Sequence, residues 1–168
     1  TNTGEIWMRI NPSEGGGLLI FDEKSGKSRL LSKNKNQGGL PGEMIYDMVL
    51  DLDGMLWIAT DKGVAYFPYP GDAISDPELN ALIPVFDNRY LLRGELINCI
   101  AVDGGNNKWI GTTLGAWLFT GDGSRLLAGF NFENSPLFSN EIIDIGINGK
   151  TGEIFFATSK GLISYRGT

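Results

Sequence analysis

The sequence predicts an all-β protein assembled from one repeated unit. The repeat itself, the turn residues inside it and the near absence of helix signals carry that prediction. Three copies of a short pattern place Thr three residues after an aromatic anchor and Gly six residues after it, and a fainter copy begins at Ile6. A sequence period of about 20 to 50 residues is typical of repeat architectures. The anchors lie about 50 residues apart, at Trp7, Trp57, Trp109 and Phe155.

The repeat over residues 97–132 predicts four short strands. Its first apolar run is typical of a buried strand and stops at the glycine-rich turn 104–107. Further turns at Thr113-Leu114 and Asp122-Gly123 separate the strands that follow. Four antiparallel strands per repeat form one blade of a β-propeller. The expected strands are 97–103, 108–112, 115–119 and a weaker one around 125–131.

We expect a single partial β-propeller domain over residues 1–168, a fragment of a larger ring with about four blades of four-stranded antiparallel sheets. The first blade lacks its innermost strand and the last blade lacks its outermost strand. Open strand edges favour association. We therefore predict that the isolated chain self-associates, unless its three-stranded ends cover their edges in another way. The approximate blade boundaries are 1–36, 37–90, 91–134 and 135–168.

Composition and charge exclude several classes of protein. With 168 residues and 42% apolar content, the chain is long enough for one compact unit with a core. Its net charge of −6 and its lack of basic runs argue against a nucleic-acid or anionic-membrane surface. Cys99 is the single cysteine, so no internal disulfide forms, and its apolar strand favours burial. No apolar run approaches the roughly 18 residues of a transmembrane helix.

Few residues suit catalysis or metal binding. The chain has no His, which removes the Ser-His-Asp triad and most zinc sites. Asp51 and Asp53 are the nearest carboxylate pair for a glycosidase, but they lie where Asp and Asn stabilise tight turns, as Asp103 and Asn148 do in other repeats. Residues 51–54 also lack the further oxygen ligands of a calcium loop. We therefore expect no catalytic residue, no metal and no cofactor.

The repeat separates core residues from candidate binding residues. Trp57 and Trp109 recur in register, which predicts that their rings fill the space between blades. Residues that depart from the repeat are free to contact a partner, and the segment after residue 67 departs most. Its tyrosines suit sugar stacking or protein packing, and its arginine suits a carboxylate or phosphate. An ordinary blade-connecting loop is the alternative. The candidate ligand-binding or partner-binding residues are Tyr69, Asp72, Asp76, Arg89, Tyr90 and Trp117.

The repeat is similar to a known family. The pattern N-x-I-x-x-I-x-x-D-x-x-G-x-x-W-I-x-T-x-x-G-L, seen best over residues 97–119 and 42–67, resembles the two-component regulator propeller repeat. A more specific resemblance is to the final blades of the surface β-propeller proteins of the Por (type IX) secretion system of Bacteroidetes. The segments that carry this second resemblance are 101–109, 133–140, 149–158, 160–162 and 165–167.

The resemblance implies a non-catalytic scaffold or binding module of a bacterial cell-surface secretion complex. It implies export to the outer-membrane surface or the periplasm, with the signal peptide outside this chain. The implied partners are outer-membrane or surface proteins, with lipopolysaccharide or oligosaccharide as further candidate ligands, and no nucleic acid. The alternative is a periplasmic glycan-sensing propeller of a hybrid two-component regulator. A glycoside-cleaving enzyme is a third class, and the lack of His argues against it.

Overall fold

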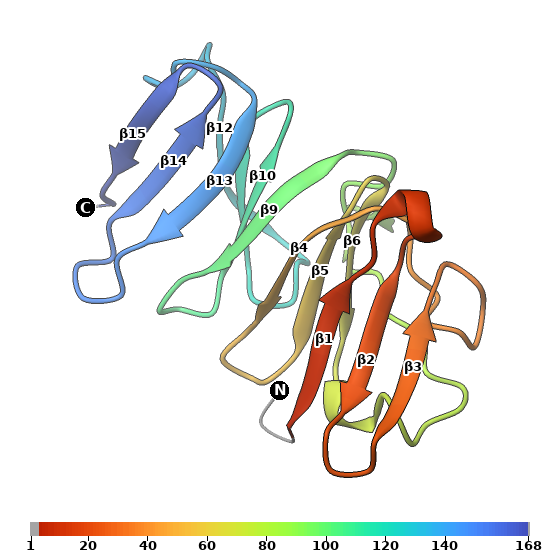
Figure 1. The fold of residues 1–168 in the computed structure, drawn as a ribbon. Coiled ribbons are helices and arrows are strands. Elements are labelled where there is room, and N and C mark those ends of the chain that lie inside the picture. The colour runs from red at the N-terminus through yellow and green to blue at the C-terminus, as the bar shows by residue number, and fades with distance from the viewer. Residues whose placement is uncertain (1–3, 168) are drawn as a thin grey trace.

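The computed structural model describes residues 4–167, which form antiparallel sheets and two short 3-10 helices, η1 (Pro12–Glu14) and η2 (Pro70–Asp72). The sheets follow one another along a curved array (Figure 1). The strands are β1 (Glu5–Arg9), β2 (Leu18–Asp22), β3 (Lys27–Leu31), β4 (Ile45–Leu50), β5 (Leu56–Thr60), β6 (Gly63–Phe67), β7 (Val85–Phe86), β8 (Arg89–Tyr90), β9 (Ile97–Val102), β10 (Lys108–Thr112), β11 (Ala116–Phe119), β12 (Leu126–Phe130), β13 (Ile142–Ile147), β14 (Ile154–Thr158) and β15 (Gly161–Tyr165).

The sheets have the order expected of propeller blades. Neighbouring strands pair as β1-β2-β3, β4-β5-β6, β9-β10-β11-β12 and β13-β14-β15, and β7-β8 form a separate hairpin. The fold is therefore all-β, a fragment of a propeller, as the sequence predicts. The second sheet differs from the expected four strands. Its fourth strand is reduced to one isolated bridge between Tyr66 and Leu82, because proline-rich sequence follows β6 and Pro cannot donate a ladder hydrogen bond.

The repeated Thr and Gly close the turn between the second and third strands of a blade. The Thr60 hydroxyl donates to the Gly63 carbonyl oxygen at 2.8 Å and accepts from the Lys62 N–H at 3.0 Å. The other two copies repeat both bonds. Gly115 has a φ of +144°, and a Cβ there would lie 2.3 Å from the Phe130 carbonyl oxygen. The pattern found in the sequence is therefore a turn signature.

The apolar core lies between consecutive sheets, in three clusters. The Trp57 ring is fully buried between the second and third sheets, and Trp109 is 3% exposed between the third and fourth. These positions confirm that the rings of Trp57 and Trp109 fill the space between blades. Cys99 is buried in the third cluster. Burial raises the pKa of its thiol to about 12, with Asp144 and Asp47 adding to the rise.

Polar side chains also join neighbouring sheets, through strands β1, β4, β9 and β13. Arg9 of β1 donates to the Tyr46 carbonyl oxygen of β4. The Asp47 carboxylate accepts from the Ile100 N–H of β9 at 3.0 Å, and the Asn98 amide of β9 donates to the Ile142 carbonyl oxygen at 2.7 Å. Each pair of consecutive sheets is thus joined by at least one side chain that bonds to the backbone of its neighbour. Such bonds satisfy backbone groups that no strand pairs.

Candidate binding site beside the inserted hairpin

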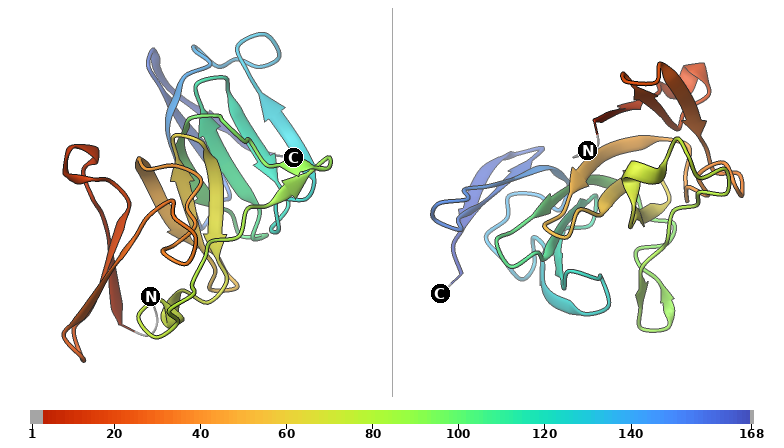
Figure 2. Two further views of the ribbon diagram at one scale, coloured as in Figure 1. Left: turned by 90° about the vertical axis from the view of Figure 1, so that its right-hand side faces the viewer. Right: turned by 90° about the horizontal axis from the view of Figure 1, so that it is seen from below.

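The segment between β6 and β9 departs most from the repeat and builds a projecting hairpin. Strands β7 and β8 pair through Val85–Tyr90 and Phe86–Arg89. The two residues between them, Asp87 and Asn88, have φ values of +49° and +57°, typical of the tight turn that suits a two-residue hairpin. The hairpin extends away from the sheets (Figure 2). Directly before this turn, the Phe86 ring meets the Phe119 ring edge-on, 5.4 Å between centroids.

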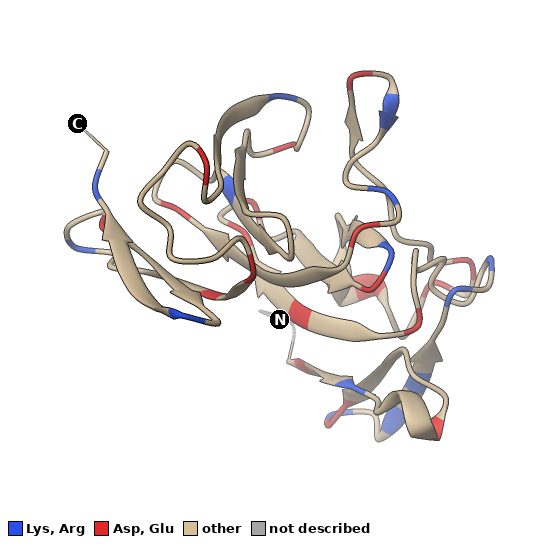
Figure 3. Cartoon of the chain, turned by 90° about the horizontal axis from the view of Figure 1, so that it is seen from above, with Lys and Arg blue, Asp and Glu red and all other residues tan. Residues whose placement is uncertain are grey.

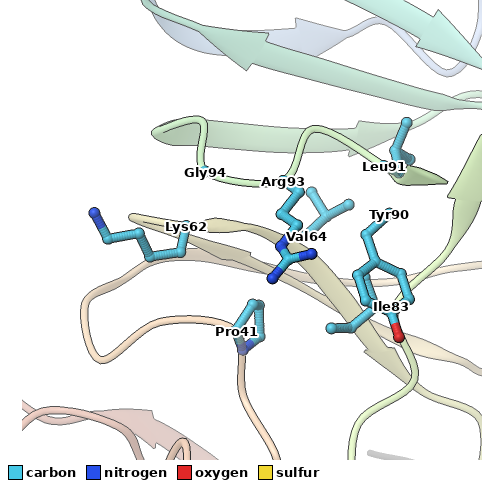
Figure 4. Close-up of a pocket in the computed structure, with 8 residues that line it drawn as sticks. All are labelled: Pro41, Lys62, Val64, Ile83, Tyr90, Leu91, Arg93 and Gly94. Carbon is cyan, nitrogen blue, oxygen red and sulfur yellow. The ribbon is translucent and has the colours of Figure 1, made fainter.

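A pocket of about 350 Å³ opens beside the base of this hairpin (Figure 4). Its floor consists of Val64 and Leu91, which are both buried. Arg93 and Tyr90 stand at the rim, and the Arg93 side chain points between Pro41 and Tyr90. The residues that line the pocket are Pro41, Lys62, Val64, Ile83, Tyr90, Leu91, Arg93 and Gly94.

Backbone bonds hold the rim of this pocket in place. The Gly94 N–H donates to the Lys62 carbonyl oxygen at 3.0 Å, so the loop after the hairpin is tied to the turn after β5. The Leu91 N–H donates to the Pro84 carbonyl oxygen at 2.8 Å. A Cβ on Gly63 would lie 3.1 Å from the Leu92 carbonyl oxygen, and Gly63 has a φ of +121°. The repeated glycine therefore also permits the close approach that forms the pocket.

Two cations at the rim have no carboxylate partner within residues 4–167. The ion pairs of the described chain are Lys33–Glu43 and Lys108–Asp51, and neither includes Lys62 or Arg93. The Arg93 guanidinium lies over the Tyr90 ring, 5.6 Å from its centroid, an arrangement that leaves its N–H groups free to donate. Elsewhere, charges of both signs are scattered over loops and strands (Figure 3).

A second, wider depression of about 790 Å³ adjoins the first pocket. It shares Tyr90 and Arg93 with the first pocket and adds Arg89, Asp87 and Glu95. The candidate residues Arg89 and Tyr90 are therefore brought together on one exposed hairpin.

The other candidate residues of the inserted segment lie elsewhere. Tyr69 is 72% exposed and precedes η2, which contains Asp72. The Asp76 side chain accepts from the Glu78 N–H at 2.9 Å, as a turn residue does. The Arg29 side chain of β3 donates to the carbonyl oxygens of Ala73 and Asp76, which fixes this loop on the first sheet. The loop at η2 and the hairpin are separate surfaces.

Trp117 lies in β11 and is partly buried. It packs against the cluster between the second and third sheets, and its indole N–H donates to the Thr112 hydroxyl at 3.4 Å. A Cβ on Gly129 would lie 2.8 Å from its ring, so the ring covers the neighbouring strand. This position gives Trp117 a packing role, with part of its surface left for a contact.

The aspartates considered for glycoside cleavage are engaged in structure. Asp51 accepts from the N–H groups of Asp53 at 3.0 Å and Met55 at 2.9 Å, which confirms its turn role. Its side chain is 1% exposed and lies 3.2 Å from the Lys108 ammonium. Among the described residues, no group of three or more His, Cys, Asp or Glu is placed to hold a metal ion. No helix within residues 4–167 is long and apolar enough to span a membrane.

Sequence reasoning missed Lys62, Arg93 and Pro41. Lys62 belongs to the repeat, where Lys160 occupies the same turn position in the fourth sheet, so the repeat assigned it a turn role only. Arg93 follows the insertion directly, and its charge next to a departure from the repeat was the available signal. Their proximity depends on the Gly94–Lys62 backbone bond.

Several known structures have a fold similar to that of this chain. The fold is similar to PorZ, an essential bacterial surface component of the type-IX secretion system of Porphyromonas gingivalis, with a TM-score of 0.86 and 28% identity, over 98% of this chain and 25% of PorZ. The chain thus spans about a quarter of that protein. No protein-family model and no curated protein matches the sequence.

More distant structures share the propeller fold alone. The extracellular domain of a putative hybrid two-component system from B. thetaiotaomicron has a TM-score of 0.64 and 19% identity, over 96% of this chain and 19% of that one. Virginiamycin B lyase from Staphylococcus aureus has a TM-score of 0.52 and 13% identity, over 96% of this chain and 52% of the lyase. The fold therefore occurs in surface proteins and in enzymes, and it does not by itself assign a reaction.

Proposed function

We propose that the chain forms part of a non-catalytic binding module of a bacterial surface protein-secretion complex of the type-IX kind. In this proposal the sheets are a rigid scaffold, and the β7–β8 hairpin with its pocket is the contact surface for an outer-membrane or surface protein. The 28% identity to PorZ over 98% of the chain supports this assignment.

The inserted hairpin is the observation that carries the proposal. Residues shared by the repeats are used for turns and for packing between sheets, whereas Arg89 and Tyr90 are exposed on a hairpin inserted between two blades. Tyr90 is 49% exposed, and Arg89 and Arg93 have no carboxylate partner in the described residues. Exposed Tyr and Arg are the side chains that most often anchor protein interfaces.

The same geometry supports a role without catalysis. Asp51 is buried and paired with Lys108, so it has neither access to a substrate nor a free proton-transfer role. Asp53 accepts from the Asn106 amide at 2.8 Å. With no His in the chain, a Ser-His-Asp triad cannot form.

Co-purification of paired variants tests the proposed contact surface. We expect the double variant Arg89→Ala/Tyr90→Ala to lose recovery of outer-membrane proteins, because it removes both hairpin anchors. The matched control is Tyr69→Ala/Asp72→Ala, which changes two exposed residues of the separate loop at η2. Both variants should keep the melting temperature of the parent chain. Unchanged recovery with the hairpin variant, or equal loss with both, would contradict the assignment of the hairpin.

A periplasmic glycan-sensing propeller is the second candidate, favoured by the fold shared with the B. thetaiotaomicron extracellular domain. On this alternative an oligosaccharide, or the sugar portion of lipopolysaccharide, raises the melting temperature by mass action. A thermal-shift screen over a glycan panel that includes lipopolysaccharide measures this directly. Shifts that survive the hairpin substitutions would favour a sensor site elsewhere on the propeller.

A further inference from the structure

We infer that the pocket beside the hairpin recognises an acidic polypeptide segment, with an aliphatic side chain in the pocket and a neighbouring carboxylate on Arg93 and Lys62. This inference rests on the proposed binding function and names the chemistry of its partner.

Charge complementarity is the first argument. The chain carries a net charge of −6, yet the residues that line this pocket include two cations and no acid. Asp87 and Glu95 line the neighbouring depression instead. Neither cation is neutralised by a carboxylate within residues 4–167. The planar guanidinium of Arg93 suits two parallel bonds to one carboxylate, and the Lys62 ammonium on its flexible stem can approach the same group as a point charge.

The shape and lining of the pocket are the second argument. Val64 and Leu91 form a buried floor, and Pro41 and Ile83 form half-buried walls. The apolar surface open to a ligand belongs to Pro41 and Ile83, so an aliphatic side chain that enters removes water from these two walls and from its own surface. The volume of about 350 Å³ lies at the small end of ligand pockets, which span roughly 300 to 1,000 Å³. It fits a side chain with its adjoining backbone.

The donor and acceptor inventory excludes a sugar as the preferred ligand. Lys62 and Arg93 only donate hydrogen bonds, and no side-chain carboxylate or amide lines the pocket. The single side-chain oxygen is the Tyr90 hydroxyl. Sugar hydroxyls bound here would find no carboxylate or amide side chain as an acceptor, and unpaired buried donors weaken binding. The Tyr90 ring face is also partly covered by the Arg93 guanidinium, which removes stacking area for a sugar ring.

The third argument is that contacts within the chain order the rim of the pocket before a ligand binds. The Gly94–Lys62 bond fixes the spacing of the two segments that carry the cations, and the Tyr90 ring supports the Arg93 side chain. A site that is already ordered loses less entropy on binding than a flexible one. The position of the two charges is therefore a property of the fold.

Fluorescence anisotropy with labelled peptides tests the inference on the full chain. The probe is a pool of acetylated hexapeptides with Leu, Ile or Val beside Asp or Glu at the centre, and the reference pool has Asn or Gln in place of the acids. We expect the acidic pool to bind roughly tenfold more tightly than the amide pool, because the amide cannot replace the carboxylate on Arg93. Equal binding of the two pools, or no binding of either, would overturn the inference.

Variants locate the binding. Arg93→Ala should weaken binding of the acidic pool about tenfold and Lys62→Ala by a smaller factor, while Arg93→Lys restores part of the loss. Lys160→Ala is the matched control, since Lys160 has the same turn position and the same bond to a repeat threonine as Lys62 but lies outside the pocket. A loss with Lys160→Ala equal to that with Lys62→Ala would show only a general charge effect.

The experiments distinguish a failure of the peptide-binding inference from a failure of the proposed function. If Arg93→Ala abolishes peptide binding but outer-membrane proteins are still recovered, the pocket chemistry stands and the hairpin is not the secretion contact. If recovery is lost with Arg89→Ala/Tyr90→Ala while the acidic pool never binds, the binding module stands and the pocket inference fails. Oligogalacturonate that binds through Arg93 more tightly than the acidic peptides would replace the peptide by an acidic glycan and overturn the inference.

Discussion

The interface between the second and third sheets contains a buried ion pair, whereas the interface between the third and fourth sheets is packed without one. In the first, the Lys108 ammonium lies 3.2 Å from the Asp51 carboxylate, and the two side chains are 0% and 1% exposed. In the second, Ile154 occupies the repeat position of Lys108 and is buried among apolar side chains. The first interface thus buries a charge where the repeat otherwise has an apolar residue.

The neighbours of Asp51 and Lys108 explain how these two buried charges are tolerated. Asp51 accepts from the Trp57 indole N–H at 3.0 Å, and Lys108 also donates to the Asn106 carbonyl oxygen at 2.6 Å. The Lys108 ammonium lies 5.0 Å from the centre of the Trp57 ring. Burial still lowers the pKa of Lys108, and Asp51 opposes that shift.

The second interface satisfies its aspartate from within one sheet. Asp103 accepts from the Trp109 indole N–H at 3.3 Å and from the Asn107 amide at 3.2 Å. All three residues belong to the third sheet and its turn. The comparison teaches that the same Asp–Trp unit stabilises a turn in both places, and that Lys108 additionally fastens one sheet to the next.

The largest effect is expected from Asp51→Ala, which leaves the Lys108 charge buried without its partner. We expect a loss of about 3 to 5 kcal/mol in the free energy of unfolding. Asp103→Ala should cost only about 1 to 3 kcal/mol, because its partners are neutral donors. Denaturant unfolding of both variants measures the difference. Equal losses would show that the ion pair adds nothing to the turn.

Lys108→Met sharpens the comparison, since it gives the first interface the apolar character of the second. We expect a loss of about 2 kcal/mol in the free energy of unfolding, because the Asp51 carboxylate stays buried but keeps its three N–H donors.

In the double variant Asp51→Asn/Lys108→Met, the loss should be smaller than the sum of the losses in the two single variants, with a coupling of roughly 0.5 to 3 kcal/mol. Strictly additive losses would mean that the two groups do not interact.

A smaller difference between the two interfaces is expected in how the free energy of unfolding changes at alkaline pH. The Cys99 thiol in the second interface has a pKa of about 12 in the fold and 9.0 as its ordinary value. Between these values the unfolded chain releases the proton and the folded chain retains it, so stability falls as pH rises. The expected loss is about 1.4 kcal/mol at pH 10 relative to pH 8. Lys108, whose pKa is lowered, acts with the opposite sign.

Unfolding of Cys99→Ala at both pH values isolates the thiol contribution. This variant should lose less stability between pH 8 and pH 10 than the parent chain, by the amount that the thiol contributes. Lys108→Met, which keeps the thiol, should lose more than the parent. A Cys99→Ala chain that loses as much as the parent would show that the thiol ionises equally in both states.

Much of the fold and part of the site could be predicted from the sequence. The repeat positions Thr60 and Gly63 form the turn that their spacing indicates, and the hairpin residues Arg89 and Tyr90 are exposed where the repeat breaks. The missing fourth strand of the second sheet was not predicted, because the count of four relied on the repeat and not on the prolines that follow β6.

The sequence by itself determined the β-rich repeat, the turns and the packing of the aromatic anchors, because these depend on residues close together in the chain. Only the tertiary structure decided that Lys108 meets Asp51, and that Lys62 and Arg93 share one pocket. The Lys108–Asp51 pair joins two different sheets, and Lys62 and Arg93 join a repeat turn to the segment that follows the insertion. Their distances depend on how one sheet lies against the next, which a period of apolar and turn residues does not specify.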